Sequence, residues 1–376
     1  MSTTTRSEQL RRVGKSKLLV PQLGCGGGGW ADLKAPLSQT EAAVHSAYAS
    51  GIRLYDTAPS YGFGVSERRL GVALASLPRD QLLINSKVGQ RIVFERELDE
   101  EFARQCNGAT DAEFASAGIM NPGPRSNKLQ CRMVYDYTYE SIKAQHQETL
   151  HRLGTAYIDS CVIHNIDQGY HGTALAPPGN VERHYGDLKD GGGFRALEEL
   201  RNTGEIKAIG AGVNYELRNL EFWEGTPGHT PFEQLACSIA EAGDLDFYLL
   251  AGPYHLLDQR ALDALLPLCE QRTIGCFGGP PFATGILATG LVPGATYGYQ
   301  PVEELPEIAE KVGALERICQ NHGVPLGAAA LQFPIAHPCI ATVIPGMRSV
   351  EEVEQNVRNM NLDIPCGALP QWSPLS

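Results

Sequence analysis

The chain has 376 residues, enough for one large α/β barrel or two ordinary domains, and we expect a single domain over residues 1–376. It carries 31 basic and 43 acidic residues, a formal net charge of −12, which argues against a general nucleic-acid surface or an anionic-membrane surface. No apolar run has the length of a membrane span or a signal peptide. The ten cysteines show neither a CxxC nor a zinc pattern, so we expect a cytoplasmic protein with buried thiols and no metal.

The first predicted element is a hairpin over residues 11–23, in which a Gly-Lys-Ser turn separates two short apolar stretches. Its second half, residues 18–23, is expected to lead into the first barrel strand. The glycine-rich segment 24–30 follows. Its glycines allow a backbone to approach a ligand closely, but they equally suit a loose loop. The segment is not a GxGxxG motif before a helix, so it carries no dinucleotide fingerprint of that kind.

Strand-like and helix-like stretches then alternate to the end of the chain. Further apolar strands are predicted at residues 52–56, 82–87, 158–164, 206–213, 247–251, 274–277 and 340–344. Helical patterns are predicted at 38–49, 66–76, 138–153, 194–203, 216–223, 258–272, 302–321 and 349–360, with one or two extra turns at 325–337. Ser38 is the expected cap of its helix, with Glu41 three residues on. Eight strand–helix units with nearly continuous apolar strands favour a closed parallel barrel over an open sheet.

Two connections, residues 88–136 and 165–193, are too long for ordinary loops between a strand and a helix. Both follow strands that end in candidate functional residues, so both are expected to rise over the same face of the barrel. One interpretation is a lid and a substrate wall. The alternative is an insertion that is disordered or contacts another subunit.

Four residues that can carry proton chemistry lie at the ends of predicted strands. Asp56, Lys87 and His164 each end a strand, and Tyr61 lies in the Pro-Ser turn after Asp56. The carboxyl ends of barrel strands converge on one face, so the four are expected to lie together. A lysine and a carboxylate beside a tyrosine bias the phenol proton toward transfer near neutral pH. Taken singly, a tyrosine on the rim can be packing and a strand-end histidine can be a core group.

Five stretches in chain order carry a resemblance to a known family: YDTAPSYGFGVSERRLG, SKVG, DSCVIH, GEIKAIGAGVN and VIPGMRSVEEVEQN. Over nearly the whole chain they resemble the aldo-keto reductase superfamily. This implies an α/β fold, a (β/α)8 TIM barrel with an N-terminal β-hairpin and long βα loops at the C-terminal face. The stretch LLAGPYHLLDQ, with AGVN before it, resembles the branch that contains D-threo-aldose (L-fucose) 1-dehydrogenases, pyridoxal 4-dehydrogenases and plant L-galactose dehydrogenase.

The resemblance implies a role for each of the four candidates. Tyr61 would be the general acid or base that touches the substrate oxygen. Lys87 would lower the pKa of the tyrosine and pair with Asp56. His164 would donate a hydrogen bond to the same oxygen. The hydride would travel to or from a nicotinamide ring.

Cofactor contacts implied by the resemblance fall in three regions. Asn214 would hold the nicotinamide carboxamide, although a turn residue would also suit its position. The loop 281–287 would fold over the pyrophosphate through Phe282, Gly285 and Leu287. Many relatives have a tyrosine just before this loop that stacks on the nicotinamide, but this chain has Gly278, Gly279 and Pro280 there.

The third region is the start of the last helix, whose free N–H groups and dipole suit a phosphate. Its implied contacts are Gly346, Arg348, Gln355 and Asn356. Relatives that prefer NADP commonly carry a basic residue where this chain has Glu352, so NAD is the expected cofactor, with NADP possible. The candidate substrate contacts are Trp30 and Tyr254.

The sequence therefore predicts an NAD(P)-dependent oxidoreductase that oxidises C1 of a free aldose to a lactone. Two alternatives within the class are a pyridoxal 4-dehydrogenase and an NADPH-dependent aldehyde or ketone reductase. An alternative from another class is a cofactor-binding regulatory subunit, because potassium-channel β subunits resemble this family. The expected partner is a small molecule, a sugar or a small aldehyde or alcohol, and neither a nucleic acid nor a membrane. The oligomeric state stays open.

Overall fold

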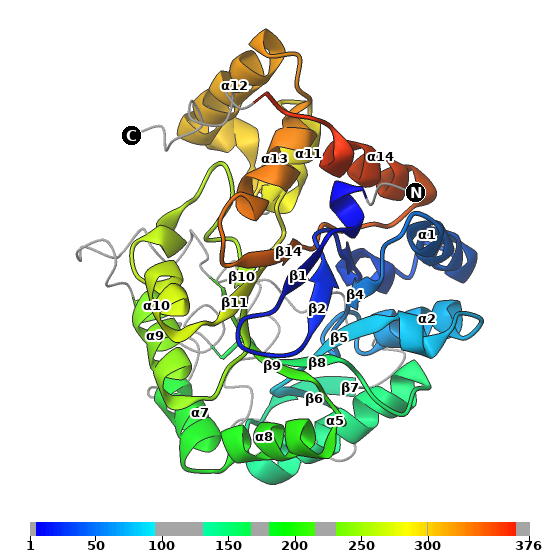
Figure 1. The fold of residues 1–376 in the computed structure, drawn as a ribbon, viewed down its shortest axis with the longest axis vertical. Coiled ribbons are helices and arrows are strands. Elements are labelled where there is room, and N and C mark those ends of the chain that lie inside the picture. The colour runs from blue at the N-terminus through cyan, green and yellow to red at the C-terminus, as the bar shows by residue number, and fades with distance from the viewer. Residues whose placement is uncertain (1–4, 95–130, 167–179, 215–230, 299, 366–376) are drawn as a thin grey trace.

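The computed structural model describes residues 5–94, 131–166, 180–214, 231–298 and 300–365. In this part of the chain, eight parallel strands form one sheet in the order β3-β4-β5-β8-β9-β10-β11-β14 (Figure 1). These strands are β3 (Cys25–Gly26), β4 (Leu54–Asp56), β5 (Leu83–Val88), β8 (Ser160–His164), β9 (Ala208–Asn214), β10 (Phe247–Ala251), β11 (Gly275–Gly279) and β14 (Ile340–Val343).

The first and last strands of this sheet meet, which closes the barrel. The backbone N–H of Gly24 donates to Val343 O at 2.8 Å, and the N–H of Gly26 donates to Pro345 O at 2.8 Å. Parallel bridges also join Leu23 to Val343 and Gly26 to Gly346. The predicted (β/α)8 barrel is confirmed, and its carboxyl-terminal rim is the place where catalytic residues of such barrels lie.

The predicted N-terminal hairpin is present as β1 (Leu10–Arg12) and β2 (Leu19–Pro21), which pair antiparallel. It lies across the amino-terminal end of the barrel, nearest the viewer in Figure 1. Residues 18–23 lead into the first barrel strand, as expected. That strand is Cys25–Gly26, inside the glycine-rich segment, and Leu23 just before it already bridges to Val343 on β14.

The barrel interior is filled by apolar side chains from the hairpin and from several strands. The rings of Phe247 and Phe277 stack with centroids 4.2 Å apart, and Val13 and Leu18 pack in the same cluster. Burial of each such large side chain contributes roughly 1.5–3 kcal/mol to folding. Gly210 has no room for a side chain, because an added Cβ would lie 2.4 Å from the Phe247 ring.

Helices surround the sheet, as Figure 1 shows. The described ones are α1 (Leu37–Ala49), α2 (Val65–Leu74), α5 (Tyr139–Leu153), α7 (Asn180–Lys189), α8 (Gly193–Thr203), α9 (Pro231–Ala242), α10 (Leu265–Arg272), α11 (Ile286–Thr289), α12 (Pro306–Asn321), α13 (Leu326–Ile335) and α14 (Val350–Asn361). The cap expected at Ser38 was wrong: α1 begins at Leu37, and Pro36 takes the cap position without a side-chain hydrogen bond. None of the described helices is long and apolar enough to cross a membrane.

The assignment of the seventh barrel helix also needs a correction. The sequence pattern predicted this helix at residues 302–321 and only one or two helical turns at 325–337. In the structure α13 packs against β14 and α14, whereas α12 lies outside α13 at the top of Figure 1. Eight of the ten residues of α13 are buried, as expected of a helix that contacts the sheet directly.

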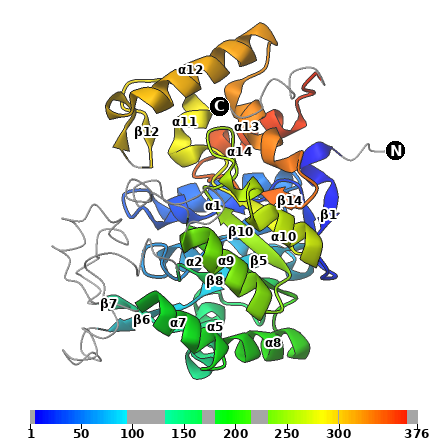
Figure 2. The same ribbon diagram turned by 90° about the vertical axis from the view of Figure 1, so that its left-hand side faces the viewer.

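Both long connections contain elements that the sequence pattern did not predict. In the first, β6 (Gln90–Phe94) and β7 (Cys131–Tyr135) pair antiparallel. Figure 2 places β6 and β7 at the side of the molecule opposite β1, where the carboxyl ends of the strands lie. In the second, α7 packs against α8, and the Tyr185 hydroxyl donates to Ser238 O on α9 at 3.2 Å. The helix expected at 216–223 lies outside the described residues.

Candidate active site

The four candidate residues come together at the carboxyl-terminal rim. Asp56 ends β4, Lys87 lies near the end of β5, His164 ends β8, and Tyr61 lies in the turn after β4. The three strands are consecutive in the sheet and pair in register. All four residues therefore lie at the same edge of the sheet, as expected from their positions at or just after strand ends.

Lys87 is enclosed by oxygen atoms. Its Nζ lies 2.8 Å and 2.9 Å from the two oxygens of Asp56 and donates to Thr57 O at 2.8 Å. The lysine side chain is 1% exposed and the aspartate side chain 8% exposed. A buried ammonium needs such partners, because an unpaired charge in the interior is strongly unfavourable.

Tyr61 lies over this ion pair, with its ring centroid 4.7 Å from Lys87 Nζ. Burial alone would lower the pKa of Lys87, but the charge of Asp56 and then Tyr61 outweigh burial and raise it. Lys87 is therefore a cation throughout the neutral pH range. A permanent positive charge beside a phenol favours the phenolate form and helps the phenol to exchange a proton.

His164 stands beside Tyr61, with ring centroids 6.2 Å apart and ring planes at 86°. Burial, and secondly the charge of Lys87, hold the pKa of His164 well below its ordinary value. The ring is therefore neutral at neutral pH, with one N–H donor and one acceptor nitrogen. The Tyr137 hydroxyl donates to His164 O at 2.7 Å and fixes the end of β8.

The turn that carries Tyr61 is rigid. Gly62, Phe63 and Gly64 have φ values of 65°, 54° and 80°, so the chain makes a tight left-handed turn directly after the tyrosine. An added Cβ at Gly62 would lie 2.9 Å from the Ala31 Cβ, which restricts this position to glycine. The backbone N–H of Gly64 donates to Pro59 O at 2.8 Å and closes the turn.

Sequence reasoning missed two polar residues behind this site. Asn85 Nδ2 donates to Asp56 Oδ1 at 2.6 Å, and Ser160 Oγ donates to Asn85 Oδ1 at 2.6 Å. The signal was present, because Asn85 lies two residues before Lys87 and alternate residues of a strand share a face. Asn85 is thus a polar residue on the same inward face of β5 as Lys87.

Two glycines line open space at the neighbouring strand ends. An added Cβ at Gly285, after β11, or at Gly346, after β14, would meet no atom within 4 Å. Ala283 and Thr284 before Gly285 have positive φ values of 48° and 59°, a strained backbone of the kind found at ligand sites. Gly346 lies four residues before α14, whose N-terminal dipole suits a phosphate. These residues fit a dinucleotide.

Arg348, the candidate phosphate ligand, is already paired. Its Nε and Nη2 donate to Glu352 Oε1 at 3.1 Å and 2.8 Å, and its backbone N–H donates to Glu352 Oε2 at 2.7 Å. The Ser349 side chain caps α14 by accepting from the Glu352 N–H at 3.3 Å. An anion that approaches Arg348 therefore meets the Glu352 carboxylate as well.

The other cofactor candidates differ in exposure. Leu287 is fully buried in an apolar cluster with α12 and α13, so its side chain faces the core. Phe282 is half-buried at the edge of that cluster. Gln355 is exposed and Asn356 is buried on α14. Asn214 ends β9 opposite Ala251, and its side chain lies outside the described structure.

The two candidate substrate contacts pack inside the protein. Trp30 is 1% exposed, and its indole N–H donates to Met347 O at 2.8 Å, which ties the glycine-rich segment to the start of α14. Tyr254 packs against Phe333 and His337, with ring centroids 5.3 Å and 5.6 Å away. Burial raises the pKa of Tyr254 to about 12.

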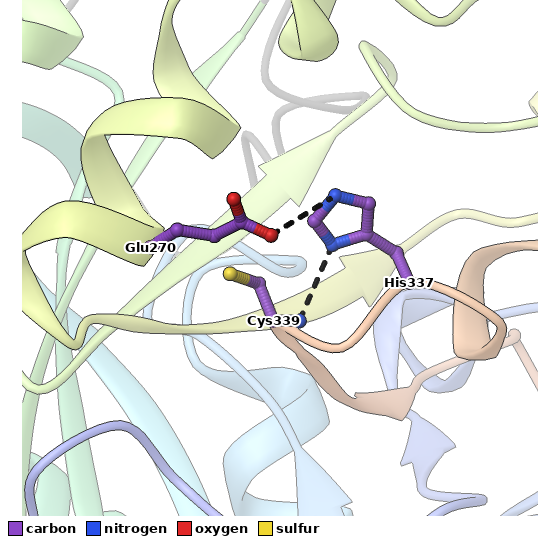
Figure 3. A group of neighbouring side chains, drawn as sticks. All are labelled: Glu270, His337 and Cys339. Atoms are coloured by element: carbon purple, nitrogen blue, oxygen red, sulfur yellow. Dashed lines mark hydrogen bonds and ion pairs between the residues drawn. The ribbon is translucent and has the colours of Figure 1, made fainter.

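Glu270, His337 and Cys339 form a group of possible metal ligands in the described part of the chain (Figure 3). His337 Nδ1 accepts the backbone N–H of Cys339 at 3.2 Å, so Nε2 carries the proton of the neutral ring. Nε2 faces Glu270 Oε1 at 3.8 Å, and a metal would need that nitrogen unprotonated. The group lies at the amino end of β14, away from Tyr61, and we assign it no metal.

Comparisons with known proteins agree with this geometry. A family model described as Aldo/keto reductase family matches residues 22–368. The chain is 33% identical over 362 residues to pyridoxal 4-dehydrogenase from Microbacterium luteolum, covering 96% of this chain and 95% of that protein. It is 32% identical over 362 residues to D-threo-aldose 1-dehydrogenase from Pseudomonas sp, covering 96% and 94%. Aldo-keto reductase AKR11C1 from Bacillus halodurans (holo form) shares the fold at 22% identity, with a TM-score of 0.64 over 97% of this chain and 95% of that one.

Proposed function

Because this chain belongs to the aldo/keto reductase family and is an oxidoreductase, we propose that it oxidises C1 of a free aldose to a lactone with NAD. The observation that carries the proposal is the contact of Lys87 with Asp56 directly beside Tyr61, at the rim where three strands end. The family uses nicotinamide cofactors, which accept or supply a hydride.

The proposed reaction divides the two hydrogens of the sugar hemiacetal between two acceptors. A bound nicotinamide would supply the acceptor for the C1 hydrogen and both of its bonding electrons, so that C1 would become the lactone carbonyl. The phenolate of Tyr61 takes the proton of the C1 hydroxyl. Lys87 stabilises the phenolate electrostatically, and Asp56 keeps Lys87 charged and in place. His164, neutral because it is buried, donates an N–H to the same substrate oxygen.

The substrate class rests on the two relatives, which are almost equally similar to this chain. An aldopyranose is a cyclic hemiacetal, and pyridoxal can close to one through its neighbouring hydroxymethyl group. The same proton and hydride transfers would convert either compound to a lactone. Pyridoxal is therefore the second candidate substrate, favoured by the 33% identity to pyridoxal 4-dehydrogenase. Aldehyde or ketone reduction with NADPH would run the same chemistry in reverse.

The cofactor proposal rests on the pairing of Arg348 with Glu352. The 2′-phosphate of NADP carries nearly two negative charges and requires a basic clamp. Two hydrogen bonds join the Arg348 guanidinium to Glu352, so the carboxylate partly offsets its positive charge before any cofactor binds. NAD has a hydroxyl in place of that phosphate and avoids the repulsion.

The test of the proposed function is turnover, followed at the absorbance band of the reduced nicotinamide. The panel is L-fucose, L-galactose, D-arabinose and pyridoxal, each with NAD and with NADP. Tyr61→Phe keeps the ring and removes the transferable proton, so we expect kcat to fall by ~10² or more, the scale of general acid–base catalysis, with cofactor binding nearly unchanged. Wild-type turnover by purified Tyr61→Phe would exclude this role for Tyr61. Tight cofactor binding without turnover of any substrate would favour a regulatory subunit.

We also propose that the insertions 88–136 and 165–193 of this single-domain barrel form the substrate walls. They follow β5 and β8, the strands that carry Lys87 and His164. Phe94 and Cys131 face each other across β6 and β7, so a two-residue turn can join them and delete residues 95–130. We expect KM for the sugar to rise, tenfold for each ~1.4 kcal/mol of lost contact, with an unchanged unfolding temperature. An unchanged KM would exclude the first insertion from substrate binding.

A further inference from the structure

A row of buried polar side chains crosses three strands one layer deeper in the barrel than Lys87. Ser160 on β8 donates to Asn85 on β5, and Asn85 donates to Asp56 on β4, both at 2.6 Å. The Cα register pairs Asn85 with Ser160 on one side and with Asp56 on the other, so the three side chains lie at one level. Asn85 and Ser160 are both fully buried.

The direction of these hydrogen bonds follows from chemistry. Asp56 is paired with the Lys87 ammonium and is therefore a carboxylate, which only accepts. The Asn85 group that faces it must be the NH2, which leaves the amide oxygen toward Ser160. The Ser160 hydroxyl must then donate. The row is thus oriented from Ser160 through Asn85 to Asp56.

An amide in this position requires an explanation, because the neighbouring interior cluster is apolar. Leu54, Val162 and Phe247 are among the inward-facing neighbours in the interior cluster. A buried amide is unfavourable unless it is hydrogen-bonded, and an aliphatic residue would fill the same space without that requirement. What Asn85 supplies is a second donor on Asp56 Oδ1, beside the one from Lys87.

We propose that Asn85 is a positioning residue for the reaction, which fixes the Asp56 carboxylate so that both of its oxygens accept from Lys87. Ser160 fixes Asn85 in turn. Asn85 acts on Tyr61 only through Asp56 and Lys87. The inference rests on the proposed roles of Tyr61 and Lys87.

The test compares three substitutions on two adjacent strands. Asn85→Leu removes the donor to Asp56 at a similar side-chain size. Ser160→Ala keeps Asn85 and removes only the hydroxyl that orients it, so it serves if Asn85→Leu does not fold. Ser86→Ala is the matched control. Ser86 is also fully buried on β5, next to Asn85, but its hydroxyl donates at 2.8 Å to Glu67 on α2, outside the barrel interior.

The main readout is the pH dependence of kcat in the dehydrogenase direction. Loss of the N–H dipole leaves the site more negative, disfavours the Tyr61 phenolate and raises its pKa. We expect Asn85→Leu to move the profile to higher pH by about half a unit, less than the roughly one to three units produced by a full charge. Ser160→Ala moves it the same way by less, and Ser86→Ala leaves it in place. An unshifted Asn85→Leu profile, or an equal shift in Ser86→Ala, overturns the proposal.

A second readout separates this proposal from the proposed function. Tyrosinate formation is followed by ultraviolet difference titration, with Tyr61→Phe subtracted to isolate Tyr61. Asn85→Leu should raise the Tyr61 midpoint even if no substrate on the panel is turned over. An unchanged midpoint refutes the positioning role, whereas absent turnover with a raised midpoint refutes only the proposed substrate.

Discussion

Two cation–carboxylate pairs in this protein have the same nitrogen–oxygen distance and very different surroundings. Lys87 Nζ lies 2.8 Å from Asp56, with side chains 1% and 8% exposed. Arg348 Nη2 lies 2.8 Å from Glu352, with side chains 65% and 35% exposed. Water and salt screen the Arg348–Glu352 pair, whereas the Lys87–Asp56 pair lies in surroundings of low dielectric constant. The same contact therefore has different consequences at the two places.

The contrast in burial determines which ion pair can exchange its partner. The Lys87–Asp56 pair cannot open without leaving a bare charge in the barrel, so it suits a permanent electrostatic task beside Tyr61. The Arg348–Glu352 pair can open into water at little expense, so a ligand can compete for either member. We propose that the buried pair sets the proton chemistry and that the exposed pair sets the cofactor choice.

The largest expected effect is on stability. Asp56→Asn keeps the shape of the side chain and strands the Lys87 charge, so we expect the free energy of unfolding to fall by about 3–5 kcal/mol. Glu352→Gln should lower it by less than about 1 kcal/mol, because exposed pairs contribute little. Urea unfolding of both variants measures the contrast.

The double variant Asp56→Asn with Lys87→Met is the control for this experiment. It removes both charges, so it should recover part of the stability lost in Asp56→Asn alone. Equal losses in Asp56→Asn and Glu352→Gln would mean that burial does not distinguish the two pairs, and the comparison would fail.

The sequence predicted the buried pair better than the exposed one, for a physical reason. Asp56 and Lys87 end adjacent strands of a predicted parallel barrel, and the geometry of that barrel brings strand ends together. Arg348 was expected to contact the cofactor, and its pairing with Glu352, four residues later, was not predicted. Whether such side chains pair depends on their rotamers at the surface, which no strand or helix pattern specifies.

Two other features of the structure were also predicted wrongly or missed. The sequence pattern predicted helical residues in both α12 and α13 but assigned the longer one to the barrel. Helix length does not show which helix contacts the sheet. In the structure α13 contacts the sheet, and α12 packs outside α13. Asn85 was not predicted, because it lies inside β5 and the prediction used residues at strand ends. Alternation along β5 assigns Asn85 and Lys87 to one face, so this contact was predictable in principle.

The next largest effect concerns the buried pair and activity. Lys87→Met removes the cation beside Tyr61, and we expect kcat to fall by ~10² or more, the scale of general acid–base catalysis. The pKa of Lys87 is raised, so the wild-type residue is charged at every pH of the assay. Without it the phenolate is less favoured, the pKa of Tyr61 rises, and the pH–rate profile of the dehydrogenase direction moves upward. An unshifted profile at a measurable rate would make the lysine structural.

The smallest effect concerns the exposed pair and the cofactor. Like charges close together in a partly exposed site cost about 1 kcal/mol or more, and each 1.4 kcal/mol is tenfold in affinity. We therefore expect the wild type to prefer NAD over NADP by roughly tenfold in kcat/KM. Steady-state kinetics with both cofactors measure this ratio.

Two substitutions at Glu352 test how its carboxylate contributes to the expected preference for NAD over NADP. Glu352→Gln removes the carboxylate and leaves Arg348 without its ion-pair partner, so kcat/KM with NADP should rise both from the loss of repulsion and from the available guanidinium. Glu352→Arg also adds a cation for the 2′-phosphate, so it should reduce the preference for NAD over NADP further. This additional increase in kcat/KM with NADP should become smaller at high salt. Neither variant should change kcat with saturating NAD, because Lys87, Asp56 and Tyr61 are untouched. A wild type that prefers NADP would show that Arg348 leaves Glu352 and binds the 2′-phosphate. The solvent-exposed ion pair would then open to bind NADP instead of repelling it.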